Sequence, residues 1–195
     1  MKKIIYIQEN FLEESLCKLF IDLSKKNLNE IPYGNSTRGG DTFLTSLNRP
    51  QDEPMIPDSD GSYGAIYLGG NVDPTPIEGN ENDLFSRVVN SVTNICKTFD
   101  KDVILDYVAI VRWPPGTFMK PHLDKNDIHG QDVFAAMLYL NNDFEGGHTC
   151  FEDFEVKPEP GKLLIFSNSL YLHHVSKVED SDRFALSFWY KYENS

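Results

Sequence analysis

Two side chains near the middle of the chain have the types and spacing of metal ligands. His122 and Asp124 stand two residues apart in the stretch Pro121-His122-Leu123-Asp124. In an extended segment, residues i and i+2 point to the same side, so an imidazole nitrogen and a carboxylate oxygen can converge on one ion. One histidine and one carboxylate are only half of a metal site, and a second histidine is needed to complete it.

Two adjacent histidines farther along the chain can supply that ligand. They are His173 and His174, and neighbouring residues of a strand point to opposite faces, so only one of the two would reach the ion. Two histidines and one carboxylate occupy one face of an octahedron and leave the other positions open for substrate and oxygen. This arrangement is typical of non-haem Fe(II) oxygenases.

A charged residue opens the apolar stretch that follows these histidines. Arg183 stands at the head of residues 183–190, and charged groups inside a β core are rare. Arginine is the natural bidentate partner of a buried carboxylate. The position of Arg183 therefore raises the odds that His122 and Asp124 belong to a functional site.

The elements that must position these residues can be predicted from the hydrophobic pattern. A short strand over residues 4–7 leads into a helix with apolar residues at helical spacing between Leu12 and Leu23. A second helix is predicted over residues 82–98. The segment 33–80 between them is rich in Gly, Pro, Asn, Asp and Ser, which predicts a long loop that acts as a lid or binding segment.

The second half of the chain is predicted to be β throughout. The expected strands are residues 103–113, 133–140, 148–151, 162–166 and 183–190, separated by turn residues such as Gly146-Gly147. Helices followed by a run of short strands predict an α+β, mostly β fold with the N-terminal helices packed on one face of a β-sandwich or barrel. We expect one domain over residues 1–195, with helical support in 1–100 and a catalytic core in 103–190.

Residues 103–190 resemble the catalytic core of the 2-oxoglutarate- and Fe(II)-dependent dioxygenases, and most of all the prolyl 4-hydroxylase-like branch. The motifs that carry the resemblance occur in the family's order. They are Arg112-Trp113-Pro114-Pro115-Gly116, His122-Leu123-Asp124, Tyr139-Leu140-Asn141, Gly146-Gly147, the histidine pair and Arg183. The resemblance implies a double-stranded β-helix, or jelly-roll, core.

The resemblance also implies cofactors and roles for the matched residues. Iron would be held by His122, Asp124 and one of the two later histidines. The family's register favours His173 over His174, because the basic residue follows the histidine by ten positions in many relatives. Arg183 would pair with the far carboxylate of 2-oxoglutarate and Tyr139 would donate a hydrogen bond to it. Ascorbate is a candidate reductant for reactivation.

The implied reaction is hydroxylation of a C–H bond, with O2 consumed and 2-oxoglutarate decarboxylated to succinate and CO2. Peptidyl-proline is the candidate substrate, by likeness to the branch alone. Another protein residue, a small molecule, or a jelly-roll module that binds without turnover remain as alternatives. The retention of Asp124 favours hydroxylation over halogenation, because halogenases leave that position open for halide.

Composition limits the partners and the compartment. The formal net charge is −12, and so acidic a surface repels phosphate backbones, so we expect no nucleic-acid partner. Cys17, Cys96 and Cys150 are widely spaced and are expected to be buried free thiols. The short apolar run after Met1 is not a signal peptide core, and no stretch has the length of a membrane span, which predicts a cytoplasmic protein.

Overall fold

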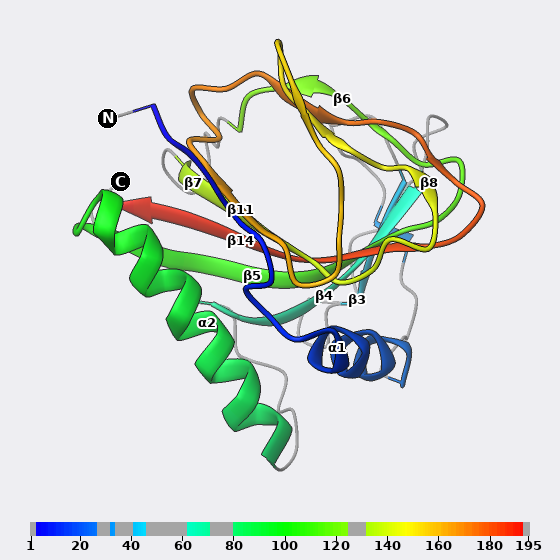
Figure 1. Ribbon diagram of the computed structural model, residues 1–195, viewed down its shortest axis with the longest axis horizontal. Coiled ribbons are helices and arrows are strands. Elements are labelled where there is room, and N and C mark those ends of the chain that lie inside the picture. Colours follow the sequence, from blue (N-terminus) through cyan, green and yellow to red (C-terminus); the bar gives the residue numbers. More distant parts are fainter. Residues whose placement is uncertain are drawn as a thin grey trace.

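The computed structural model describes residues 3–26, 32–33, 41–45, 62–70, 80–124 and 132–192. Two helices precede most of the strands in the chain (Figure 1). The helices are α1 (Glu14–Lys26) and α2 (Asn80–Phe99). The strands are β1 (Ile5–Gln8), β2 (Pro32–Tyr33), β3 (Asp41–Thr45), β4 (Ser62–Gly70), β5 (Val103–Trp113), β6 (Met119–His122), β7 (Asp132–Tyr139), β8 (Glu145–Gly146), β9 (Thr149–Cys150), β10 (Glu155–Val156), β11 (Leu163–Phe166), β12 (His173–Val175), β13 (Val178–Glu179) and β14 (Arg183–Tyr192).

The strands form a large sheet and a small one that face each other. The large sheet has the order β1-β11-β7-β14-β5-β4-β3-β2, and the small one has the order β10-β9-β12-β6. A two-stranded sheet, β13-β8, lies beside them. In the large sheet, long β14 is central and pairs antiparallel with both β5 and β7. This arrangement is the double-stranded β-helix that the sequence predicts.

Both helices cover the outer face of the large sheet (Figure 1). Cys17, Phe20 and Leu23 on α1 recur at helical spacing and are buried, as is the stripe of Phe85, Val88, Val92 and Cys96 on α2. They pack against the outward residues of β5, β7 and β14, including Ile110, Leu138, Leu186 and Phe188. The helices therefore bury one face of the sheet and leave the other face to the small sheet.

The inner face of the large sheet carries the residues expected to do chemistry. Side chains alternate between the faces of a strand, so Phe184 and Leu186 on β14 pack under the helices while Arg183 and Ala185 point inward. On the neighbouring β7, Leu138 faces outward and Tyr139 faces inward. The register of β14 with β7 thus fixes which residues line the space between the sheets.

Most of the predicted elements are confirmed, and one prediction is wrong in part. The helix predicted over 82–98 is α2, and the strand predicted over 103–113 has the bounds of β5. The segment 33–80 contains β3 and β4, which extend the large sheet beyond β5. The sequence analysis missed them because both strands stand in a segment dominated by Gly, Pro, Asn, Asp and Ser. The remainder of that segment lies outside the described residues.

The cysteines and helices agree with two further expectations. Cys17, Cys96 and Cys150 are free and buried. Burial raises the pKa of the Cys17 thiol to about 11 and that of Cys96 to about 12, which keeps both protonated and unreactive at neutral pH. Across the parts of the chain that are described, neither helix combines the length and the hydrophobicity that crossing a bilayer requires.

Candidate metal centre

The small sheet places two histidines side by side. His122 ends β6 and His173 begins β12, and the two residues are direct partners in the antiparallel register of these strands. Their ring centroids lie 4.3 Å apart. Residues directly opposite each other in an antiparallel pair project to the same face. The pairing of β6 with β12 therefore brings together two imidazoles that are far apart in the sequence.

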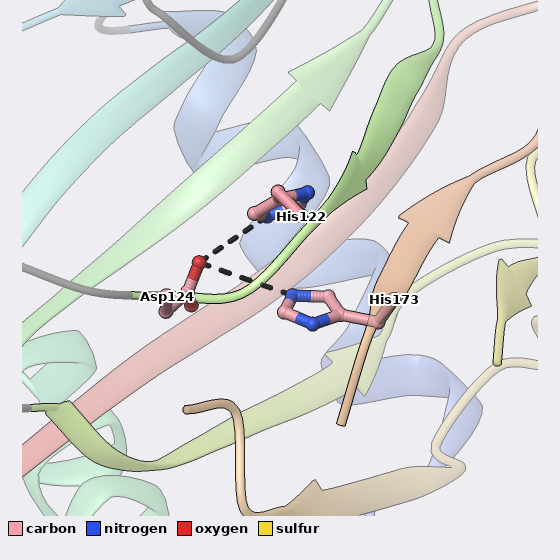
Figure 2. A group of neighbouring side chains, drawn as sticks. All are labelled: His122, Asp124 and His173. Atoms are coloured by element: carbon pink, nitrogen blue, oxygen red, sulfur yellow. Dashed lines mark ion pairs between the residues drawn. The ribbon is translucent and has the colours of Figure 1, made fainter. Parts of the chain in front are cut away.

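Asp124 completes a compact group with these histidines (Figure 2). Its carboxylate oxygen Oδ1 lies 3.2 Å from Nε2 of His122 and 3.9 Å from Nε2 of His173. One ligand atom from each of the three residues lies within 4.8 Å of the other two. Asp124 and His173 are buried and His122 is half-buried, so the group is shielded yet open on one side.

Backbone carbonyls set the orientation of both imidazole rings. Nδ1 of His122 lies 2.8 Å from the carbonyl oxygen of Lys120, and Nδ1 of His173 lies 2.9 Å from that of Tyr171. Because a carbonyl only accepts, Nδ1 must carry the proton in each ring. The neutral form of each ring then has its lone pair on Nε2, the atom that faces Asp124. Both histidines are thus prepared to bind a cation.

His174 lies away from this group. It pairs with Cys150 on β9, whereas His173 pairs with His122 on β6. Adjacent residues of β12 project to opposite faces, so His174 points away from the side where His122 and Asp124 meet. The structure therefore brings His122, Asp124 and His173 together and leaves His174 out.

Arg183 is fully buried between the sheets. Its guanidinium carbon lies 5.4 Å from the ring centroids of Trp113 and Tyr139. Within the described residues, none of its three side-chain nitrogens makes a hydrogen bond. Burial lowers the pKa of Arg183 to about 10, which Tyr139 offsets only in part. A buried guanidinium of this kind is costly to the folded protein unless an anion pairs with it.

Tyr139 connects the arginine to the metal ligands. Its hydroxyl donates a hydrogen bond of 2.7 Å to Oγ1 of Thr149 on β9, and so links the large sheet to the small one. Burial raises the pKa of Tyr139, so the phenol remains a neutral donor. The ring packs in one apolar cluster with Phe166, whose own ring lies 4.7 Å from that of His173. Arg183, Tyr139 and the histidine thus line one continuous interior.

The glycine pair noted in the sequence gives the arginine its space. Gly147 has a φ of +62°, a conformation that L side chains rarely adopt. A Cβ atom at Gly147 would lie 2.9 Å from Cδ of Arg183 and 2.9 Å from a ring atom of Phe144. The absence of a side chain therefore allows the chain just after β8 to pass directly over the guanidinium stem.

One residue of this region was missed by the sequence analysis. Asn168 is fully buried, and its amide nitrogen donates a hydrogen bond of 2.9 Å to Oδ2 of Asp124. It stands in the polar run Ser167-Asn168-Ser169, between an apolar strand and the histidine pair. Three polar residues in a turn are common, so only the long-range contact between residues 124 and 168 reveals their importance.

The match to a known family covers the strands that carry these residues. Residues 108–191 match the model of the 2OG-Fe(II) oxygenase superfamily. A protein of Acanthamoeba polyphaga mimivirus named "Putative prolyl 4-hydroxylase" is 26% identical over 121 residues, which are 50% of each chain. Prolyl 3-hydroxylase 2 of Homo sapiens is 32% identical over 65 residues, or 29% of this chain and 9% of that protein. The chain thus spans half or less of the length of these curated relatives.

Solved structures share the fold over nearly the whole chain. A prolyl-4-hydroxylase of Pseudomonas putida superposes with a TM-score of 0.70, covering 97% of this chain and 92% of that one at 17% identity. The viral collagen prolyl hydroxylase of Paramecium bursaria Chlorella virus-1, solved as a 2OG complex, gives 0.64, with 95% and 94% covered at 18% identity. At such identities the likeness shows the fold, which is the double-stranded β-helix. Residues 108–191 are thus similar in sequence to the 2OG-Fe(II) oxygenase superfamily, and the chain shares its fold with proteins named as prolyl hydroxylases.

Proposed function

We propose that this chain is a 2-oxoglutarate- and Fe(II)-dependent dioxygenase that hydroxylates a C–H bond, with a prolyl residue of a peptide or protein as its substrate. The observation that carries the proposal is a pair of features in one interior. One feature is the compact group of His122, Asp124 and His173, and the other is the fully buried Arg183. A metal-binding module has no need of the arginine, and an anion-binding module has no need of the metal ligands.

The donor atoms of the metal group fit Fe(II). Two imidazole nitrogens and one carboxylate oxygen form the set that suits non-haem Fe(II) oxygenases, which need one face of the octahedron free. His122 and His173 present Nε2 because their Nδ1 atoms are held by backbone carbonyls. Asp124 presents Oδ1, the oxygen that lies nearest to both rings.

The anion site fits the distal carboxylate of 2-oxoglutarate. Arg183 offers a planar fork of donors that matches a carboxylate in bidentate geometry. Tyr139 lies against the same guanidinium, but its one phenolic proton is donated to Oγ1 of Thr149. The hydroxyl would have to turn from Thr149 to the carboxylate to make the hydrogen bond assigned to it from the sequence. In this arrangement the dicarboxylate would span the interior from Arg183 toward the metal ligands.

The chain's own contribution to the reaction is position and exclusion of water. Fe(II) and 2-oxoglutarate, when bound, would supply the oxidising chemistry that turns O2 and the keto acid into succinate, CO2 and one oxygen atom inserted into a C–H bond. His122, Asp124 and His173 hold one face of the coordination sphere. Arg183 neutralises and orients the dicarboxylate, and the surrounding apolar residues Val111, Trp113, Phe166 and Val175 keep the interior dry.

The choice of a prolyl substrate rests on the proteins that this chain is similar to. The mimivirus protein and both structural neighbours carry prolyl hydroxylase names. Fold alone does not define a substrate, since one scaffold serves many functions. Other protein residues and small molecules therefore stand as the alternative outcomes of a substrate test.

We expect proline-containing peptides to gain the mass of one oxygen atom when incubated with the protein, Fe(II), 2-oxoglutarate, ascorbate and O2. Mass spectrometry would follow the peptides while succinate is measured in the same samples. Matched peptides with alanine in place of proline are the substrate control, and Asp124→Ala is the enzyme control. Succinate formed in step with hydroxylated peptide, and absent in Asp124→Ala, supports the proposal.

Two different failures can be distinguished in this assay. Hydroxylation of a non-prolyl residue or of a metabolite, with succinate still formed, would refute the prolyl assignment and retain the dioxygenase. No succinate above the Asp124→Ala background with any peptide or metabolite pool would contradict the enzymatic proposal itself.

A further inference from the structure

We propose that Asn168 is a positioning residue that makes Asp124 bind the metal through one oxygen only, and so keeps a coordination position open for O2. This inference rests on the proposed function, since it concerns the same metal group. It starts from the two oxygens of one carboxylate, which have different surroundings. Oδ1 of Asp124 faces the two histidines, whereas Oδ2 accepts a hydrogen bond of 2.9 Å from the amide of Asn168.

Asn168 is held in place independently of the metal group. It belongs to a turn of residues 167–171, whose first residue, Ser167, makes two hydrogen bonds to Ile4, the residue before β1. The backbone nitrogen of Ser167 donates to the carbonyl oxygen of Ile4, and Oγ of Ser167 accepts from the nitrogen of Ile4, each at 3.0 Å. Within the turn, the nitrogens of Leu170 and Tyr171 both donate to the carbonyl of Ser167. The amide of Asn168 therefore approaches Asp124 from a fixed support.

The same turn orients two of the three proposed ligands. The carbonyl oxygen of Asn168 accepts from the backbone nitrogen of Asp124 at 3.1 Å, and its side chain holds the carboxylate. The carbonyl oxygen of Tyr171 holds Nδ1 of His173 at 2.9 Å. Residues that hydrogen-bond to metal ligands fix the orientation of those ligands, and their loss weakens metal binding. Two residues of the turn, Asn168 and Tyr171, thus set the orientation of Asp124 and His173.

The number of oxygens that Asp124 offers decides what else can bind. Three protein ligands leave three positions in an octahedron, of which 2-oxoglutarate takes two and O2 needs the last. A carboxylate that bound through both oxygens would occupy that last position. Asn168 prevents this because its buried N–H engages Oδ2 in an interior where hydrogen bonds are strong. Loss of the donor would remove the restraint that Asn168 places on Oδ2.

Two variants of Asn168 test this role. Asn168→Leu removes the donor with little change of volume, and Asn168→Ala removes it and leaves a small cavity, so a shared effect cannot come from packing. Ser169→Ala is the matched control. Ser169 is the next residue of the turn, is buried, and its hydroxyl makes no hydrogen bond within the described residues. All three variants retain the backbone bond between residues 124 and 168.

Two quantities are measured. Water-proton relaxation reports the water bound to Mn(II) in the anaerobic protein with 2-oxoglutarate. The affinity of each variant for Fe(II) is measured separately. Wild type and Ser169→Ala should keep one exchangeable water on the metal. Both Asn168 variants should lose this water and bind Fe(II) roughly 10- to 100-fold more weakly, the usual effect of removing such a partner. Water and affinity unchanged in both Asn168 variants, or failure of both to fold, would overturn the inference. Absence of metal binding by wild type would refute the proposed function instead.

Discussion

Replacing His173 with alanine is expected to abolish tight Fe(II) binding, whereas replacing the adjacent His174 with alanine should leave it nearly unchanged. His173 presents Nε2 to the same point as Asp124 and His122, and its loss leaves only two protein ligands. His174 projects from the other face of β12, opposite Cys150. Because the two histidines are neighbours in one strand, each variant controls for the general effect of losing an imidazole there.

Fe(II) affinity in this comparison would be measured anaerobically by competition with a chromogenic chelator, and circular dichroism would verify that both variants are folded. A loss of binding in His174→Ala with normal binding in His173→Ala would show that the histidine assignment is wrong. Equal losses of Fe(II) affinity in both variants would indicate that an intact β12, and not His173 as a ligand, is needed for Fe(II) binding.

The variant Arg183→Met should bind 2-oxoglutarate about 100-fold more weakly or worse, yet be more stable than wild type when no ligand is present. Removing one partner of a buried charged pair costs about 2–5 kcal/mol of binding. In the unliganded protein, however, the buried guanidinium has a pKa lowered to about 10 by desolvation. That shift corresponds to a cost on the order of 3 kcal/mol to the folded state, which an apolar side chain of similar length removes.

Thermal unfolding of the metal-free protein and calorimetric titration of 2-oxoglutarate onto the Mn(II) form would measure these two effects. The sign follows from the direction of the shift. A base whose pKa is lowered on folding disfavours the folded state at every pH below that value, so the gain should be complete at neutral pH. Arg112→Met is the control, since Arg112 is part-exposed and paired with Asp182 at 2.8 Å. A lower melting temperature for Arg183→Met, or unchanged affinity for 2-oxoglutarate, would contradict the role given to Arg183.

The chemistry of the site could be predicted from the sequence because it depends on residue types in a fixed order. His122 and Asp124 have a spacing that strand geometry converts into proximity, and Arg183 is conspicuous as a charge at the head of an apolar strand. The resemblance favours His173 over His174, and the register of β12 against β6 places His173 directly opposite His122. Cross-strand register follows from long-range pairing, which no local pattern encodes.

The supporting contacts were beyond prediction for the same physical reason. Asn168 touches Asp124 across 44 positions of sequence, and Tyr139 reaches Thr149 through the space between two sheets. Strands β3 and β4 were also missed, because β4 pairs with β5 and β3 pairs with β4 through backbone contacts that the sequence pattern does not reveal. Local sequence patterns show which positions of a helix or strand are buried. The partners of each buried polar group emerge only when the chain is folded.

The central claim is that one interior binds Fe(II) and 2-oxoglutarate together, and its most direct test is the visible absorption of the anaerobic protein. Addition of both should produce the weak metal-to-ligand charge-transfer band of a keto acid chelated to Fe(II), saturating at one equivalent of each. The band should disappear in Asp124→Ala and require far more 2-oxoglutarate in Arg183→Met. A wild-type protein that binds Fe(II) and 2-oxoglutarate without this band, or a band undiminished in Asp124→Ala, would contradict the account.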